Sequence, residues 1–290
     1  MLVPLVRSLR PAQWSKNVFV FAPLVFAQKL QDPHALLRAT LAFAAFCSAA
    51  SAVYLVNDVR DRDEDRRHPL KRHRAIAAGT LGVGPALVAA TLLAVAAGVA
   101  AWRLGPAFTA LLGGYVLLNL TYSLYLKQRV ILDVMAIAAG FVLRVVAGAV
   151  AVPAPVSSWL LLCTIFLALF LAFSKRRHEL TLLQDGAADQ RRVLEHYSPA
   201  FLDQMINVVT ASAVVSYALY AVAPETVQKF HTEHLVYTVP LVLFGIFRYL
   251  YLVYQSPGAR NPTEAILHDP PFLLNIALWG LAVLWIVYGL

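Results

Sequence analysis

The acidic segment that leaves the second apolar stretch of the chain holds the residues best suited to chemistry. Asn57, Asp61 and Asp65 are spaced i, i+4 and i+8, so they share one face if the helix continues for two more turns, with Asp58 beside them. Carboxylates stacked one turn apart repel each other, and the arrangement therefore favours a bound cation. Carboxylates that share a metal with a phosphate are a common Mg²⁺ setting in proteins. The spacing predicts a magnesium-binding wall of side-chain oxygens.

Basic side chains follow this acidic face at once. Lys71 and Arg74 come within a few residues of Asp65, so a metal-binding face stands next to cations suited to a phosphate-bearing ligand. An exposed helix laced with Asp–Arg pairs is the alternative, and it is the commoner explanation of an arbitrary charged loop. Because the segment directly abuts an apolar stretch of membrane-spanning length, we favour the ligand-binding interpretation.

A second constellation surrounds Asp133, the only acid between Asp65 and Glu179. The residues that precede it in the sequence include Tyr122 and Lys127. Three roles for Asp133 remain open: it binds a second Mg²⁺, accepts a hydrogen bond from a sugar hydroxyl, or orients Lys127.

Three further cations stand in or at the end of apolar stretches. Arg144 falls in the middle of one, where insertion of an arginine costs roughly 2.5–3.5 kcal/mol and the side chain usually faces a cavity or a partner. We expect either a functional Arg144 or a structural pair with Asp133. Lys175 and Arg176 stand at the charged end of another apolar stretch and suit a phosphate group.

Composition places these residues in a membrane protein. The 290 residues are 60% hydrophobic and 14% charged, with a mean hydropathy of +0.66, which is too apolar for a soluble domain. The basic balance is therefore explained by topology and phosphates rather than by nucleic acid. Cys47 and Cys163 lie in apolar runs and predict no disulfide framework. Breaks of charge, Pro and Gly divide the chain into nine predicted spans, at about 18–30, 35–56, 80–102, 106–126, 130–152, 156–174, 205–223, 235–255 and 271–290.

The basic residues predict the orientation. With nine spans, the N-terminus and the long charged loops at about 57–79 and 175–204 share one side, which holds most of the chain's 24 Lys and Arg residues. By the positive-inside rule this side is cytoplasmic, and the chain is a multi-pass protein of the inner (plasma) membrane. The opposite side holds only Lys29, Arg38, Arg103 and Lys229.

The acidic segment resembles a known family. Asn57-xxx-Asp61-xxx-Asp65, followed by His68-Pro69, Lys71 and Arg74, looks like the first aspartate-rich motif of the UbiA superfamily of intramembrane prenyltransferases. The resemblance implies one all-α transmembrane domain over residues 1–290. It also implies a nine-helix bundle with a cytoplasm-facing polar cavity and aspartate-rich motifs that hold Mg²⁺ and a diphosphate.

One departure from that pattern points to a particular branch. The chain lacks the second Asp-xxx-Asp of ordinary members, and its segments at 10–17, 122–133, 140–148 and 174–179 are similar to those of decaprenyl-phosphate phosphoribosyltransferases. This resemblance implies Mg²⁺-dependent transfer of 5-phosphoribosyl from phosphoribosyl diphosphate to a polyprenyl phosphate, with Mn²⁺ as a substitute metal. The implied catalytic residues are Asn57, Asp61 and Asp65, and the implied metal ligands are Asp58, Asp61 and Asp65. The implied substrate-binding residues are Lys16, Lys71, Arg74, Tyr122, Lys127, Asp133, Arg144, Lys175 and Arg176.

Other functions are weighed against this one. The alternative enzyme moves a polyprenyl group from its diphosphate to an aromatic acceptor, and the missing second Asp-xxx-Asp counts against it. A lipid-phosphate transporter would be expected to carry paired broken helices at the midplane, and none is evident. A purely structural subunit gives no reason for the placement of Asp61, Asp65 and Arg144. The sequence leaves the oligomeric state open, including a homo-oligomer.

Overall fold

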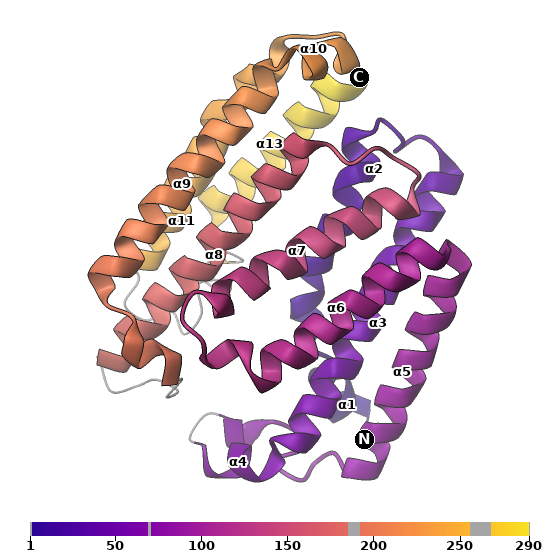
Figure 1. Ribbon diagram of the computed structural model, residues 1–290, viewed down its shortest axis with the longest axis vertical. Coiled ribbons are helices and arrows are strands. Elements are labelled where there is room, and N and C mark those ends of the chain that lie inside the picture. Colours follow the sequence, from indigo (N-terminus) through magenta and orange to yellow (C-terminus); the bar gives the residue numbers. More distant parts are fainter. Residues whose placement is uncertain (1, 69–70, 185–191, 256–267, 290) are drawn as a thin grey trace. The chain divides into compact units, whose positions relative to one another are not determined.

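A computed structural model describes residues 2–68, 71–184, 192–255 and 268–289, and every regular element in these ranges is a helix (Figure 1). The predicted all-α class is therefore confirmed for the described residues. The longer helices are α3 (Pro33–Arg60), α5 (Val83–Leu104), α6 (Pro106–Leu124), α7 (Leu132–Ala151), α8 (Ser158–Gln184), α9 (Pro199–Val222), α11 (Val239–Gln255) and α13 (Pro270–Tyr288). The shorter ones are α1 (Leu2–Leu9), η1 (Pro11–Phe21), α2 (Ala22–Phe26), α4 (Arg62–Arg67), η2 (Lys71–His73), η3 (Leu126–Gln128), η4 (Arg192–His196), α10 (Pro224–Phe230) and η5 (His234–Thr238).

Local sequence explains where several long helices begin. Proline occupies the first helical turn of α3, α6, α9 and α13, where its missing N–H costs nothing. A polar side chain caps three of these helices: Asp32 accepts from His34 N, Ser198 from Phe201 N and Asp269 from Phe272 N. The N-terminal ends are therefore encoded within four residues of sequence.

Eight helical segments in the described part of the chain are long and apolar enough to cross a membrane. They correspond to the second through ninth predicted spans, and the chain is a multi-pass membrane protein. The count of nine is not confirmed, because the first predicted span, 18–30, lies in the 3₁₀-helix η1 and the five-residue helix α2.

The chain forms two compact units, which are described separately. Unit 1 comprises residues 1–127 and 139–156, and unit 2 comprises residues 128–138 and 157–290. Helix α7 supplies its first seven residues to unit 2 and the remainder to unit 1. The single-domain prediction for residues 1–290 remains a prediction.

Small residues let the helices of unit 1 approach closely. Helix α3 packs along α5 (Figure 1), and α3 buries a series of alanines that includes Ala42, Ala45 and Ala49. Phe46, which is fully buried, contacts the ring of Phe108 edge-on and the ring of Tyr115. The apolar core of unit 1 therefore joins α3 to α6.

Glycine brings η1 against α7. A Cβ added at Gly148 would collide with the backbone carbonyl group of Val20, whose Cα would then lie at only 3.1 Å. Val20 is fully buried in the same core. The 3₁₀-helix therefore packs backbone to backbone on α7, and only glycine leaves room for that approach.

Two cations of unit 1 satisfy carbonyl groups at helix ends. The Arg38 guanidinium donates to the carbonyl oxygen of Ala151 at the end of α7 and, over 3.1 Å, to that of Leu104 at the end of α5. Lys29 Nζ donates to the carbonyl oxygens of Val152 at 3.0 Å and Pro153 at 2.7 Å. Cations at helix C-termini satisfy orphan carbonyls and match the helix dipole. Lys29 and Arg38, both predicted to lie on the side opposite the charged loops, thus have structural partners.

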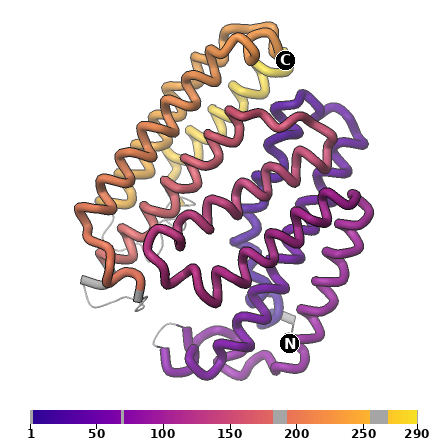
Figure 2. The backbone as a smooth tube through the Cα atoms, in the orientation of Figure 1, coloured from indigo at the N-terminus to yellow at the C-terminus, as the bar shows by residue number. Residues whose placement is uncertain are grey.

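In unit 2, α8 runs alongside α9 and α11 alongside α13, as the tube in Figure 2 shows. The bidentate pair of Arg248 with Asp269, at 3.0 and 2.7 Å, joins α11 to the start of α13. Tyr217 Oη and Thr238 Oγ1 share a hydrogen bond of 2.7 Å, and Trp279 Nε1 donates to the same Tyr217 oxygen. These polar groups of unit 2 are satisfied by one another, as an apolar surrounding requires.

Large apolar side chains cover the outer faces of the long helices. Leu92, Leu117, Leu274 and Leu281 are all more than 60% exposed. Such faces are unusual for a soluble protein and expected of helices surrounded by lipid. Trp102 and Trp285, also exposed, lie near helix ends, where amphipathic rings favour the membrane interface.

The close approach at Gly148 gives a prediction about stability. Gly148→Ala should destabilise the protein by about 1–3 kcal/mol, because the added methyl overpacks η1 against α7. Thermal unfolding in detergent measures the effect. Gly98→Ala, in α5 with no atom within 4 Å of the added Cβ, is the matched control and should be neutral or slightly stabilising. Equal stability of the two variants would contradict the packing of η1 on α7.

Candidate active site

The acidic segment lies where α3 ends. The helix stops at Arg60, Asp61 has φ −86° and ψ 5°, and the short helix α4 begins at Arg62. The predicted uninterrupted helix is therefore broken at Asp61. Backbone hydrogen bonds from Asp61 N to Asn57 O, 2.9 Å, and from Asp65 N to Asp61 O, 2.8 Å, still follow the i to i+4 pattern. The helical register of the segment is thus largely kept, which explains why its acidic side chains still fall into groups.

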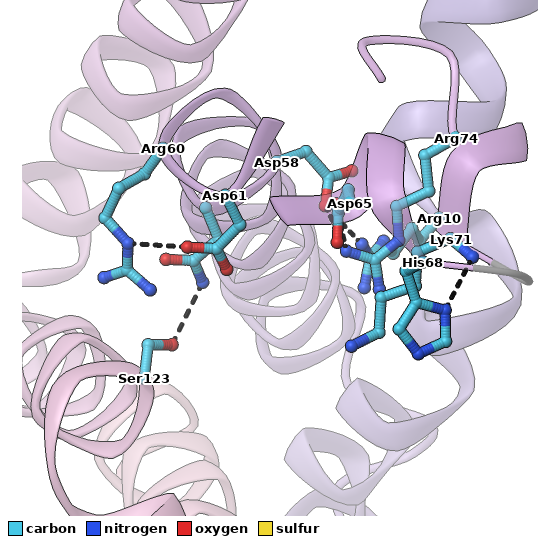
Figure 3. Close-up of polar contacts among 10 residues, drawn as sticks. Arg10, Asp58, Arg60, Asp61, Asp65, His68, Lys71, Arg74 and Ser123 are labelled. Carbon is cyan, nitrogen blue, oxygen red and sulfur yellow. Dashed lines mark hydrogen bonds and ion pairs between the residues drawn. The ribbon is translucent and has the colours of Figure 1, made fainter. Parts of the chain in front are cut away.

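Asp58 and Asp65 come together around one guanidinium group (Figure 3). Arg74 Nη1 donates to Asp58 Oδ1 at 3.2 Å and to Asp65 Oδ2 at 2.8 Å. Both carboxylates are buried, at 4% and 3% exposure. Two buried carboxylates need a positive charge nearby, and Arg74 supplies it.

Arg10 is a second cation at this group, and the sequence did not assign it a role. Its Nη2 atom donates to Asp58 Oδ1 at 2.6 Å, and its guanidinium carbon lies 4.7 Å from the centre of the Tyr54 ring. Arg10 also has a positive φ of 55°, which is uncommon for a residue with a side chain. Ser51 Oγ fixes the same turn by donating to Leu9 O at 2.9 Å. An arginine beside a proline at the start of η1 was a visible cue, but its partner lies 48 positions away.

The other two members of the acidic face have separate partners. Asp61 Oδ1 accepts from Arg60 Nε at 2.8 Å (Figure 3). Asn57 Nδ2 donates to Ser123 Oγ of α6 at 3.0 Å. Among the described residues no group of three or more His, Cys, Asp or Glu side chains stands close enough to hold a metal ion. Of the three predicted metal ligands, the structure thus brings Asp58 and Asp65 together and leaves Asp61 with Arg60.

Four predicted substrate contacts of unit 1 are partly exposed: Lys16, Lys71, Tyr122 and Lys127. Lys71, in η2, donates its backbone N–H to His68 Nδ1 at 3.2 Å, which fixes the basic turn after α4 (Figure 3). Lys16, Tyr122 and Lys127 lie in η1, α6 and η3, and each is partly exposed. Their assignment to substrate remains a prediction.

Arg144 sits in a buried cage of unit 1. Its guanidinium donates to Asn17 Oδ1 at 2.7 Å, to Tyr115 Oη at 2.8 Å and to Gly140 O at 2.8 Å. The rings of Phe46, Tyr115 and Phe141 surround its Cζ atom at 6.0, 4.6 and 5.4 Å. Neutral acceptors and aromatic faces therefore satisfy this arginine and tie η1 and α6 to α7.

Asp133 and Arg176 form a buried ion pair in unit 2. Arg176 Nε donates to Asp133 Oδ2 at 2.6 Å, and the two side chains are 1% and 0% exposed. Tyr197 Oη donates to Asp133 Oδ1 at 2.8 Å, and burial raises the pKa of Tyr197 so that its hydroxyl stays protonated. Asp133 thus contacts protein groups, and its three considered roles, at a second Mg²⁺, at a sugar hydroxyl or in orienting Lys127, stay predictions. Arg144, the partner that the sequence suggested, has its hydrogen bonds with Asn17, Tyr115 and Gly140 instead.

Lys175 differs from its neighbour Arg176. Its side chain is 40% exposed, and its Nζ lies 3.9 Å from Glu179 Oε1, whereas Arg176 reaches the other oxygen of Glu179 from inside unit 2. Lys175 is therefore the more accessible member of this pair, and its assignment to a phosphate stays a prediction.

The arrangement in unit 1 suits a cation and a polyanion together. A single cationic atom, Arg74 Nη1, already contacts both buried carboxylates, and carboxylate oxygens are the ligands that Mg²⁺ prefers. A divalent cation thus fits the donor set of Asp58 and Asp65. Partly exposed lysines nearby in the chain can neutralise phosphate oxygens.

These features define a multi-pass membrane protein whose described residues form only helices as regular elements, with an acidic segment at the end of one helix. Residues 18–268 match the UbiA prenyltransferase family, and the chain belongs to it. The resemblance that the acidic segment suggested is therefore confirmed.

Solved structures share the fold. A UbiA homolog from Archaeoglobus fulgidus, solved bound to DMAPP and Mg²⁺, has a TM-score of 0.71 at 18% identity over 99% of both chains. A UbiA homolog from Aeropyrum pernix has a TM-score of 0.69 at 15% identity. At these identities the likeness establishes the UbiA fold alone.

Two relatives in sequence are much closer than these structures. The decaprenyl-phosphate phosphoribosyltransferase of Corynebacterium glutamicum is 36% identical over 98% of this chain and 86% of its own length. The enzyme of the same name from Mycolicibacterium smegmatis is 35% identical over 95% of this chain and 89% of its own length. This chain is thus similar to them from end to end.

The buried pair in unit 2 gives a prediction. Arg176→Met should lower the free energy of unfolding by about 3–5 kcal/mol, because it leaves Asp133 charged and unpaired in the interior. Arg176→Met combined with Asp133→Leu should lose less than Arg176→Met alone. Thermal unfolding in detergent compares them.

Lys175→Met is the matched control on the same helix. Its side chain is 40% exposed and lies 3.9 Å from Glu179 Oε1, and ion pairs at exposed positions contribute little, so the substitution should cost less than about 1 kcal/mol. If Lys175→Met and Arg176→Met were equally destabilising, Arg176 would not carry the buried pair.

Proposed function

We propose that the protein transfers the 5-phosphoribosyl group from phosphoribosyl diphosphate to a polyprenyl phosphate, giving polyprenyl-phosphoryl-5-phosphoribose and diphosphate. The observation that carries this proposal is the 36% identity to a decaprenyl-phosphate phosphoribosyltransferase over nearly the whole chain. The protein is then a membrane transferase of the UbiA family whose donor and acceptor are both polyanions.

The donor diphosphate belongs at the acidic segment. Asp58 and Asp65 would hold Mg²⁺, with Asp61 and Asn57 completing the oxygen face once their side chains turn from Arg60 and Ser123. The metal supplies neutralisation of the charge that builds on the leaving diphosphate, and Mn²⁺ can replace it. Displaced from the carboxylates, Arg74 can donate to the diphosphate, with Lys71 and Lys127 binding the remaining phosphate oxygens.

The acceptor needs no strong general base. A phosphate monoester has its second pKa near 6, so its oxygen is already anionic at neutral pH. This oxygen forms the new bond to C1 of the ribose, while the bond from C1 to the diphosphate oxygen breaks and the diphosphate leaves with both electrons. Most of the rate would come from holding two repelling anions in line and stabilising the separating charge.

The cations divide between the two substrates. Lys175, exposed at the end of α8, suits the 5-phosphate of the donor or the phosphate of the lipid. Lys16 and Tyr122 are further substrate contacts. Arg144, Asp133 and Arg176 would act from their buried positions, as positioning residues for the segments that carry these contacts.

A ninth span and a cytoplasmic site complete the proposal. Eleven residues of 3₁₀-helix at about 2.0 Å each and five of α-helix at about 1.5 Å give η1 and α2 a joint length of about 30 Å, close to the bilayer core. With this segment as the first span, the acidic and basic loops face the cytoplasm of the inner membrane and line a polar cavity. The lipid tail remains in the bilayer, and residues 1–290 act as one domain.

Product formation tests the reaction. Purified protein, Mg²⁺, a polyprenyl phosphate and labelled phosphoribosyl diphosphate should give a labelled, organic-extractable lipid, and EDTA should abolish it because the donor diphosphate then lacks its counter-ion. No labelled lipid from folded protein with several chain lengths would reject the proposal. Turnover of polyprenyl diphosphate with an aromatic acceptor would then identify the alternative enzyme.

The acidic face gives a second test. Asp61→Asn and Asp65→Asn should each lower turnover by at least about 100-fold, because each removes a negative charge that would help to hold the metal at the leaving diphosphate. Asp63→Asn is the matched control: it lies in the same segment, its side chain is 74% exposed, and its turnover should stay within about twofold of the wild type. Full turnover in both Asp61→Asn and Asp65→Asn would remove these residues from the site.

A further inference from the structure

An unusual turn opens α7. The backbone N–H of Leu132 donates to Val130 O at 2.8 Å, so residues 130–132 form a three-residue turn, and its central residue, Ile131, has a positive φ of 67°. A three-residue turn with positive φ at its centre is rare and strained. The strain is larger for a β-branched residue such as Ile131, because the left-handed region brings its Cβ close to the backbone.

Packing of the Ile131 side chain does not offset this strain. It is 45% exposed, so it buries little surface, and glycine would adopt the same backbone without penalty. Something outside the turn must hold it. Strain of this kind persists only where the surroundings impose it, and such positions cluster at functional sites.

Tyr197 holds the turn. Its hydroxyl accepts a hydrogen bond from the Ile131 N–H at 2.7 Å and donates one to Asp133 Oδ1 at 2.8 Å. One oxygen atom therefore joins Ile131, just before α7, to Asp133 in the first turn of that helix. Asp133 is fixed in turn by Arg176 of α8 at 2.6 Å. Tyr197 itself is 5% exposed and stacks on Phe201, with 5.9 Å between ring centres. These contacts all lie within unit 2.

From this geometry we infer that Tyr197 is a positioning residue for the transfer reaction. It holds the strained turn at Ile131 and thereby sets the path of the basic segment that ends at the turn, in which Lys127 and Arg129 stand four and two residues before Ile131. The inference rests on the proposed function, because it assigns Lys127 to a substrate phosphate. Tyr197 itself touches protein groups and acts through the segment it fixes.

The test replaces the hydroxyl and then relieves the strain. Tyr197→Phe should lower kcat/KM for phosphoribosyl diphosphate by about tenfold, because the turn loses its hydrogen-bond acceptor and relaxes. Adding Ile131→Gly should restore most of this loss, since glycine keeps the positive φ without help. Ile131→Ala, which removes the same side chain but keeps the penalty, should not restore it.

A double-mutant cycle separates positioning from general weakening. If Tyr197 acts through Lys127, Tyr197→Phe should cost less than about twofold in a Lys127→Ala background. Full additivity of the two substitutions would overturn the inference. Tyr254→Phe is the matched control, because it also removes a hydroxyl bonded to a carboxylate, Asp203 at 2.6 Å, and it should leave kcat/KM unchanged.

A second readout needs no turnover, so it separates this inference from the proposed function. Trypsin should cleave after Lys127 or Arg129 several-fold faster in Tyr197→Phe than in the wild type, and Ile131→Gly should reverse the change. Unchanged cleavage would overturn the inference even if the enzyme transfers phosphoribosyl groups. If Tyr197→Phe does not accumulate as folded protein, recovery by Ile131→Gly alone supports the inference, and recovery by both or neither of the Ile131 variants rejects it.

Discussion

The need to neutralise buried charge is the constraint on which the rest of this structure depends. Arg74 lies between Asp58 and Asp65, two carboxylates that are almost completely buried. Arg10 is a second cation at Asp58, at 2.6 Å, so the two guanidinium groups together offset the desolvation penalty of the two carboxylates. The Arg74 contacts bring the basic turn after α4 to the acidic face. Arg74 is the guanidinium group that joins the two carboxylates to each other.

Much of the fold follows from short-range sequence. Apolar length predicted the second through ninth spans, and proline with a polar cap marked several of their starts, because both effects act within a few residues. The conformation of the segment at 18–30 could not be predicted in this way. The 3₁₀-helix η1 packs on Gly148 and bonds to Arg144 of α7, which lie more than a hundred positions away from Val20 and Asn17. Hydropathy carries no information about such a distant close approach.

The candidate site was predicted in its residue types more than in its pairings. The acidic face and the basic residues that follow it were visible as a pattern, and the structure groups Asp58, Asp65 and Arg74. Arg10 and Tyr197 were missed as partners because each acts on a residue 48 or 64 positions away. Pattern analysis also treated Asp133 and Arg176 as separate ligands. Only their complete mutual burial identifies them as one ion pair.

That ion pair bears on which anions the protein suits. Asp133 is the only acid between Asp65 and Glu179, and Arg176 neutralises its charge inside unit 2. No second pair of carboxylates remains in this stretch for another metal, whereas Lys175 stays partly exposed. One acidic face and an excess of cations along the chain suit the proposed donor, which carries a diphosphate together with a separate phosphate. A prenyl diphosphate held by two metals would call for the opposite balance of charge.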